Sequence, residues 1–244
     1  MSRDPDLSRR ALLLGAAVTG AGCNVGPYSP GFTIWSQAEP LDERLAALLG
    51  TPRAKEYDPS AISPEFPVRS LTLPPGYAES LAGWTLTVDG LVDHPRTFTM
   101  AELQAALPKV TGVTRHDCVE GWSAIAAWAG ARLVDLVDLV GPRPEVGFVV
   151  FRSADFDPPG NTPYYGSLRL RDARHPQALL AWEMNGQPLP VDHGAPLRLK
   201  VPTQLGYKST KFIHRIEFVA SLQGIGAGRG GYWEDWGYEH WAGI

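Results

Sequence analysis

Arg115-His116-Asp117-Cys118-Val119-Glu120-Gly121-Trp122-Ser123 is the stretch on which the rest of the sequence depends. It contains Cys118; the only other cysteine is Cys23, near the N-terminus. If an N-terminal leader is removed, Cys118 has no partner for an internal disulfide. Three interpretations stay open for a lone cysteine: a small buried hydrophobic residue, a reactive thiol or a metal ligand. Composition alone favours the buried residue. The choice among the three interpretations therefore depends on the residues that follow in the chain.

The bulk composition bounds the class of protein. A chain of 244 residues with 44% hydrophobic residues can bury a substantial core as one large domain or two small ones. The net charge of -4 gives no electrostatic case for nucleic acid. Two cysteines do not make a disulfide scaffold, and 22 prolines with 26 glycines favour short strands joined by loops.

Alternating hydrophobicity and turn residues predict an α+β fold with mixed sheets and short helices. A capping box of Thr99 and Glu102 predicts a helix over Met100–Ala106. A loop over Trp128–Arg132 should lead into a second helix that ends at Val140, and Asp155–Pro163 should form a loop. The expected strands are Trp84–Val92, Arg96–Met100, Val110–Cys118, Val146–Ser153, Pro196–Pro202 and Phe212–Val219.

Residues 1–23 are expected to be an export signal. Arg9-Arg10 runs into the apolar stretch Ala11–Ala21, which is too short to anchor in a bilayer and resembles a twin-arginine (Tat) signal. An ordinary secretory signal or a frayed amphipathic N-terminus are the alternatives. Cys23 follows small residues and is a candidate for lipidation, although Gly20 stands where a lipobox usually has Leu. The predicted location is therefore the periplasm or cell envelope, with membrane attachment only if Cys23 is lipidated.

The rest of the chain divides into three parts. Residues 24–63 are expected to be a linker with one surface helix over Leu41–Leu49, and residues 64–222 to form the main domain. Residues 223–244 begin with a glycine-rich bridge and end in a dense aromatic tail. Such a tail either packs back on its own domain or docks a partner.

Four separated motifs, in a consistent order between about Glu65 and Phe218, resemble the sulfite oxidase family of molybdopterin enzymes. The Cys-Val-Glu-x-Trp-Ser stretch is similar to the bacterial periplasmic methionine sulfoxide reductase catalytic subunit. The Glu-Met-Asn-Gly and Asp-His-Gly stretches are similar to true sulfite oxidases, but the Arg-bearing pattern that follows the cysteine in those enzymes is absent, which disfavours sulfite as the substrate. The motifs are Asp117–Ser123, Leu179–Pro190, Asp192–Arg198 and Gly206–Lys211.

The resemblance implies a role for each matching residue. Cys118 would supply a thiolate to molybdenum, and Tyr165 would be the tyrosine beside the metal. His193 and Arg198 would contact the pterin and its phosphate; the alternatives are a loop histidine and a surface ion pair. Gly206, Tyr207 and Lys208 would wrap the phosphate, and Ser153, Arg69 and Ser70 would also touch the molybdenum-molybdopterin cofactor.

The implied function is that of an oxidoreductase that transfers an oxygen atom to or from a small substrate of the sulfoxide or sulfite type. No Cys-x-x-Cys-His haem motif occurs in the chain. The resemblance therefore implies a separate electron-transfer protein, such as a cytochrome or a membrane haem subunit. The alternative functions are a non-catalytic carrier that keeps the fold and a thiol-redox lipoprotein. The presence of Cys118 argues against the first, and the second would need a resolving cysteine near it.

Overall fold

The computed structural model of the chain describes residues 53–244. The expected export signal, the candidate lipidation site at Cys23 and the expected helix over Leu41–Leu49 lie outside the described residues. Within the part that is described, no helix has the length and apolar character that crossing a bilayer requires.

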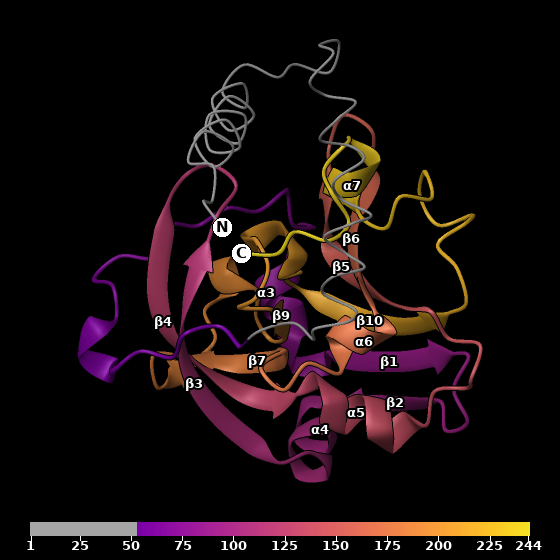
Figure 1. The fold of residues 1–244 in the computed structure, drawn as a ribbon, viewed down its shortest axis with the longest axis horizontal. Coiled ribbons are helices and arrows are strands. Elements are labelled where there is room, and N and C mark those ends of the chain that lie inside the picture. The colour runs from indigo at the N-terminus through magenta and orange to yellow at the C-terminus, as the bar shows by residue number, and fades with distance from the viewer. Residues whose placement is uncertain (1–52) are drawn as a thin grey trace, which may run out of the picture. The chain divides into compact units, whose positions relative to one another are not determined.

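The first sheet has five strands in the order β2-β1-β10-β5-β6 (Figure 1). β1 and β10 pair in parallel, while the other neighbouring strands are antiparallel. This confirms the expected mixed sheet. The strands are β1 (Thr85–Gly90), β2 (Arg96–Thr99), β5 (Phe148–Asp157), β6 (Thr162–Arg169) and β10 (Ile213–Val219).

The second sheet has the order β3-β4-β7-β8, with β9 also paired to β7. All of its pairs are antiparallel. The long hairpin of β3 and β4 carries the Cys118 stretch at its tip. The strands are β3 (Lys109–Asp117), β4 (Ser123–Arg132), β7 (Leu179–Met184), β8 (Gln187–Pro188) and β9 (Arg198–Lys200).

The helices are short and lie between or beside the strands. The capping box is present: the Thr99 side chain accepts a hydrogen bond from the backbone of Glu102, whose carboxylate in turn accepts one from the backbone of Thr99. The α-helices are α3 (Tyr77–Ser80), α4 (Met100–Ala106), α5 (Leu133–Val140), α6 (Leu170–Ala173) and α7 (Tyr232–Asp235). The single-turn 3₁₀ segments are η2 (Pro59–Ala61), η3 (Leu81–Gly83), η4 (Val191–His193) and η5 (Gly206–Lys208).

The expected loop over Trp128–Arg132 is wrong, because these residues belong to β4. Alanine and glycine are weak strand formers, so the alanine-rich β4 gave little signal. Its Gly130 is required by packing: a Cβ there would lie 2.0 Å from the carbonyl oxygen of Leu180 on β7. The expected loop over Asp155–Pro163 is also shorter than predicted, since β5 runs to Asp157 and β6 starts at Thr162.

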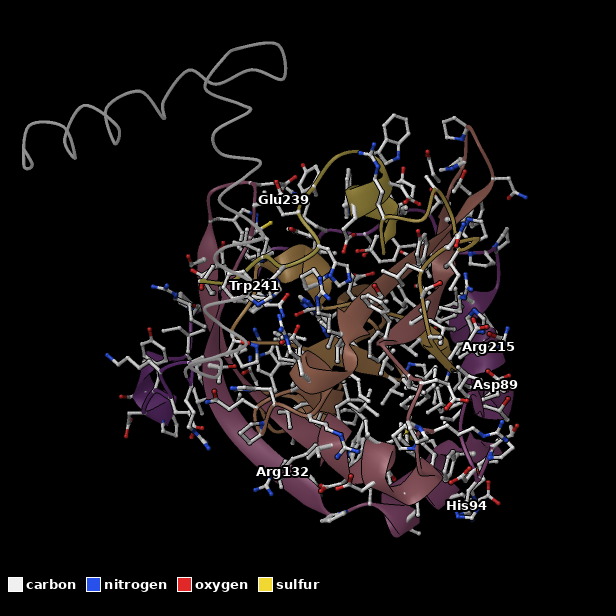
Figure 2. The ribbon with its side chains drawn as sticks, turned by 45° about the vertical axis from the view of Figure 1, so that its right-hand side comes forward. Asp89, His94, Arg132, Arg215, Glu239 and Trp241 are labelled. Carbon is white, nitrogen blue, oxygen red and sulfur yellow. The ribbon has the colours of Figure 1, made fainter. Side chains whose placement is uncertain are left out.

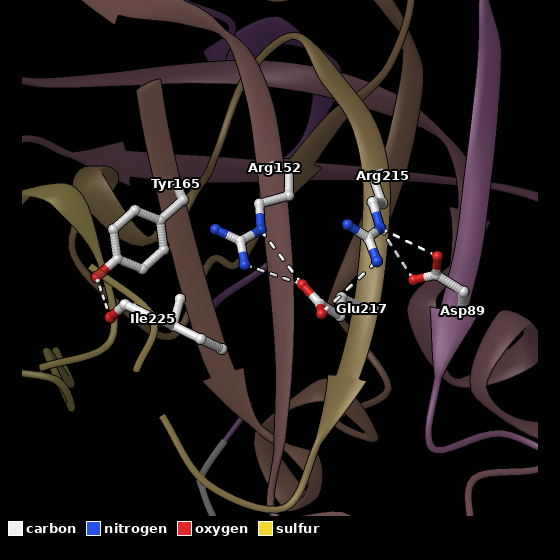
Figure 3. Close-up of polar contacts among 6 residues, drawn as sticks. All are labelled: Asp89, Arg152, Tyr165, Arg215, Glu217 and Ile225. Carbon is white, nitrogen blue, oxygen red and sulfur yellow. Dashed lines mark hydrogen bonds and ion pairs between the residues drawn. The ribbon is translucent and has the colours of Figure 1, made fainter. Parts of the chain in front are cut away.

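A large hydrophobic core packs α4 and α5 against strands from both sheets. Fully buried members include Phe98, Leu103, Leu136, Phe151 and Phe218. The exposed face of the first sheet carries a ladder of charges instead (Figure 3). Arg152 on β5 pairs with Glu217 on β10 at 2.9 Å, and Arg215 pairs with Asp89 on β1 at 3.0 Å. Such partly exposed pairs add little stability, but they favour this strand register.

The C-terminal segment, residues 224–244, packs against its own domain, which is one of the two expected possibilities. Glu234 on α7 forms a buried ion pair with Lys208 on η5. Asp235 accepts a hydrogen bond of 2.6 Å from the hydroxyl of Tyr165 on β6. Helix α7 lies beside β6 in Figure 1, and in Figure 2 Glu239 lies at the upper left of the fold with Trp241 below it.

The end of the expected linker is also in contact with a sheet. Tyr57 donates a backbone hydrogen bond of 2.9 Å to Val113 on β3. The hydroxyl of Ser63 accepts one of 2.9 Å from the backbone of Ile125 on β4. Residues 53–63 therefore lie against the hairpin that carries Cys118.

Candidate active site

Cys118 lies at the start of the tight turn that joins β3 to β4. Its backbone N–H donates to the carbonyl of Trp122 at 2.9 Å, and its carbonyl accepts from the N–H of Gly121 at 3.1 Å. Gly121 has φ of 88°, a left-handed conformation that glycine adopts without strain. The turn therefore fixes the backbone on both sides of the thiol. Cys118 is partly exposed rather than buried in the core.

Polar contacts brace this turn from inside the hairpin. Asp117 accepts a hydrogen bond of 2.7 Å from the hydroxyl of Ser123 and pairs with Arg115 at 2.8 Å. The first contact spans the turn, and the second joins two residues of β3.

Glu120 is held beside the thiol by two donors. The Nε atom of Arg69 lies 2.5 Å from its Oε2, and the indole N–H of Trp122 donates to the same oxygen at 3.2 Å. These hydrogen bonds, from Arg69 first and then Trp122, lower the pKa of Glu120. The Sγ of Cys118 lies 4.0 Å from this carboxylate oxygen. The charge nearest the thiol is thus a carboxylate already paired with a guanidinium.

A cavity of about 330 Å³ opens beside Cys118. It brings together side chains from segments far apart in the sequence. Seven of the sequence-predicted site residues line it: Arg69, Ser70, Cys118, His193, Arg198, Gly206 and Tyr207.

Arg198 and Lys211 line the cavity, and within residues 53–244 neither forms an ion pair with a carboxylate, although the charge of nearby Asp155 acts to raise the pKa of Lys211. Arg198 is 3% exposed and donates to the backbone carbonyls of His193 and Ser209, at 2.9 and 3.4 Å. Its guanidinium also lies 4.8 Å from the centre of the Trp128 ring. Lys211 contacts the hydroxyl of Ser70 and the carbonyl of Asp192. Burial lowers the pKa of Arg198 to about 10 and that of Lys211 to about 7.

His116 faces the same cavity from β3. The ring is buried, and its Nδ1 atom has no hydrogen-bond partner among residues 53–244. Burial, and then the charges of Lys200 and Arg198, hold its pKa well below the usual value. Gly206 packs directly on this ring, since a Cβ there would lie 2.4 Å from Nε2. Glycine at this position therefore lets η5 approach the Cys118 strand.

Three predicted site residues do not reach the cavity. Lys208 is 2% exposed and paired with Glu234. The hydroxyl of Ser153 contacts Asp155 and the carbonyl of Lys211, so it lies behind the cavity lining. Tyr165 lies on the charged face of the first sheet, where its hydroxyl donates to the carbonyl of Ile225 and to Asp235 (Figure 3).

For two of these three residues, Tyr165 and Lys208, a nearby residue of the same type lines the cavity instead. Tyr164, the neighbour of Tyr165, lines the cavity, and its hydroxyl donates to the carbonyl of Tyr207 at 3.0 Å. Lys211 reaches the cavity where Lys208 does not. Adjacent strand residues point to opposite faces, so a one-residue error at Tyr165 reverses the side-chain direction. Trp233 and Tyr238 of the C-terminal segment were not predicted as site residues and also line the cavity.

The chain matches the family described as "Oxidoreductase molybdopterin binding domain" over residues 73–223. It belongs to this family. The matched range contains Cys118, His193, Arg198 and both sheets. The expected recognition, the α+β fold class and the assignment as a sulfite-oxidase-family enzyme are thereby confirmed, and the non-catalytic carrier is disfavoured.

Two curated relatives cover most of the chain. A "Putative protein-methionine-sulfoxide reductase subunit YedZ1" from Azospira oryzae is 38% identical over 197 residues, which are 77% of this chain and 70% of the relative. A "Protein-methionine-sulfoxide reductase catalytic subunit MsrP" from Ralstonia nicotianae is 33% identical over 228 residues, which are 86% of this chain and 68% of the relative.

The fold is also similar to a solved structure. The sulfane dehydrogenase SoxCD from Paracoccus pantotrophus matches with a TM-score of 0.51 and 23% sequence identity. The match covers 58% of this chain and 39% of that one. It supports the arrangement of the sheets.

The residues of the cavity fit a molybdopterin cofactor. The buried guanidinium of Arg198 has no carboxylate partner among residues 53–244, so it needs an anion to offset the cost of its burial, and a phosphate supplies one. The orphaned Nδ1 of His116 offers a further hydrogen bond to a polar ring. Arg198 and Lys211 would hold the phosphate, His193 and His116 would contact the pterin, and the Cys118 thiolate would bind the metal. These roles stay predictions.

Proposed function

We propose that this enzyme reduces methionine sulfoxide side chains to methionine, with molybdenum held by the Cys118 thiolate. The observation that carries the proposal is that the partly exposed Cys118 lines a cavity together with aromatic side chains and the cations Arg198 and Lys211. The two relatives named as protein-methionine-sulfoxide reductase subunits support the same reaction. In net terms the sulfoxide takes up two electrons and two protons and leaves as a thioether and water.

When bound, the metal centre supplies a site that accepts the oxygen atom and passes on electrons. The chain orients that centre through Cys118 and limits which substrate approaches it. The guanidinium of Arg69 is committed to Glu120, so it is not free to hold an oxyanion. A neutral sulfoxide suits this charge arrangement better than sulfite does, because the carboxylate of Glu120 would repel an anion.

Exposed apolar side chains at the cavity mouth favour a substrate that is part of a polypeptide. Val119 and Tyr238 line the cavity and are 46% and 37% exposed. Val68, next to Arg69, is 41% exposed. Apolar surface of this kind around a polar pocket typically marks a docking site. A protein chain could cover it while a methionine sulfoxide side chain enters the cavity.

The test is an assay of the cofactor-loaded enzyme with reduced viologen as the electron donor. We expect turnover with N-acetyl-methionine sulfoxide and with an oxidised, unfolded protein. We expect none with sulfite when ferricyanide is the electron acceptor. Sulfite oxidation without sulfoxide reduction would refute the proposal.

We further propose that the enzyme works in the periplasm after Tat export and receives electrons from a separate haem protein. Arg9-Arg10 before a short apolar stretch is the basis for the location. The relatives' names, which call them subunits, support a partner. Replacing Arg9-Arg10 by Lys-Lys should leave active enzyme in the cytoplasm, and unchanged export would reject the Tat route. Mass spectrometry of the mature N-terminus would show whether Cys23 is acylated.

A further inference from the structure

The C-terminal segment, residues 224–244, forms part of the cavity wall. Its α7 helix is fixed by the buried ion pair of Glu234 with Lys208, whose side chains are 3% and 1% exposed. Asp235 adds a second anchor, because its carboxylate accepts hydrogen bonds from Tyr165 at 2.6 Å and from the backbone of Ala227 at 2.9 Å. A side chain on this helix therefore has a defined position relative to the cavity.

Two aromatic rings of the segment reach the cavity. Trp233 and Tyr238 both line it, and their ring centres lie 5.4 Å apart. The ring of Tyr238 also makes an edge contact with Tyr207, at 5.3 Å. Trp236 belongs to the same segment, but its side chain is 72% exposed and does not line the cavity.

This aromatic wall of Tyr207, Trp233 and Tyr238 lines the same cavity as Cys118. Tyr207 follows Gly206, and a Cβ on Gly206 would lie 3.3 Å from the carbonyl oxygen of Asp117. Asp117 directly precedes Cys118 in the chain. Because Tyr207 contacts Tyr238, the wall continues from the thiol strand to the C-terminal segment.

We propose that Trp233 and Tyr238 determine substrate specificity by holding the apolar part of the substrate beside the reacting sulfur. This rests on the proposed sulfoxide reduction and adds to it the class of substrate that is preferred: a sulfoxide with an apolar substituent. Aromatic rings gain from burying apolar surface and from contact with sulfur. A small hydrophilic sulfoxide has little apolar surface to bury against this wall, so it gains less from the contact.

Inert sulfones separate recognition from turnover, because they mimic the shape of sulfoxides and can be measured at equilibrium. The affinities of methyl phenyl sulfone and dimethyl sulfone for the cofactor-loaded enzyme would be compared by calorimetry. Burial of a ring predicts that the wild type prefers the aryl sulfone by about tenfold or more. Trp233→Ala should remove most of this preference.

Trp236→Ala is the matched control and should keep the wild-type preference. Trp233→Leu and Tyr238→Ala serve if Trp233→Ala fails to fold, and each should reduce the preference by several-fold. Three outcomes would overturn the inference. The wild type binds both sulfones equally, it binds neither, or its preference survives in folded Trp233 and Tyr238 variants. A preference that depends on Trp233 in an enzyme that reduces no sulfoxide would reject the proposed reaction instead and leave the aromatic wall standing.

Discussion

At the residue scale, we expect Cys118 to be essential for activity but to contribute little to the stability of the fold. Its side chain is partly exposed, and the turn around it is held by backbone hydrogen bonds and by Asp117. Cys118→Ser should therefore cost less than about 1 kcal/mol of stability, as surface substitutions do, yet abolish turnover because a hydroxyl is a poor soft-metal ligand. Thermal unfolding and viologen-linked sulfoxide reduction would be measured together. Activity within tenfold of wild type would contradict the role as metal ligand.

Lys200 should make the free energy of unfolding depend on pH. Its ammonium is 1% exposed and donates one hydrogen bond of 3.0 Å, to the carbonyl of Arg115. Burial lowers its pKa to about 7, from an ordinary lysine value of 10.5. The unfolded chain then binds more protons than the folded one between these two values. The free energy of unfolding should rise with pH across that window, by up to about 1.4 kcal/mol per pH unit for this group.

Lys200→Met tests this dependence. Urea unfolding at several pH values between 6.5 and 9 should show a shallower rise for the variant than for the wild type. The exposed Lys55→Met serves as the control and should leave the slope unchanged. An unchanged slope in Lys200→Met would mean that burial does not lower the pKa of Lys200 in the folded protein.

At the scale of elements, the sequence signals were strongest where a local rule applies. The capping box set the start of α4 at Met100, and alternation located β1 and β3. The alanine-rich β4 has no such signal, because its place depends on Gly130 meeting the backbone of β7. That contact joins residues far apart in sequence, so a local sequence pattern could not predict it.

The link between η5 and α7 is the element contact with the largest expected effect. Glu234→Gln would leave the buried ammonium of Lys208 without its charged partner. Breaking a buried pair in this way typically costs about 3–5 kcal/mol. We expect loss of stability by urea unfolding and faster hydrogen exchange in residues 224–244.

The exposed Glu239 provides the comparison for that change. Its backbone carbonyl accepts a hydrogen bond from Tyr207, and this does not depend on the carboxylate. Glu239→Gln should therefore shift stability by less than about 0.5 kcal/mol. Equal effects of the two substitutions would show that the buried pair does not hold the segment.

At the scale of the whole molecule, three of the four motifs contribute residues to one cavity, while the Leu179–Pro190 motif forms β7 and β8 and does not line it. Two of the predicted site residues, Lys208 and Tyr165, do not reach this cavity, while their neighbours Lys211 and Tyr164 do. Lys208 ends η5 and Lys211 follows three residues later, after a bend; the first is buried against Glu234 and the second faces the cavity. The contribution of Trp233 and Tyr238 depends on how residues 224–244 fold back, which no local pattern in the sequence specifies.

The same cavity predicts how the apoprotein responds to anions. Arg198 and Lys211 are held close together without carboxylate partners, so inorganic pyrophosphate should bind there and stabilise the folded state. At ten times its Kd, the gain is about 1.4 kcal/mol, or about 3–5 °C in Tm. The gain should shrink above pH 7, because the pKa of Lys211 is about 7 and its charge is lost as pH rises.

Differential scanning calorimetry of the cofactor-free protein measures this response, with sodium chloride at equal ionic strength as the solvent control. Arg198→Met should abolish the shift because the buried guanidinium is the strongest anion ligand in the cavity. Arg215→Met removes an arginine from the charged face of the first sheet and should leave the shift intact. A shift that both variants lose equally would place the anion on the surface of the protein and not among the residues that we expect to hold the cofactor phosphate.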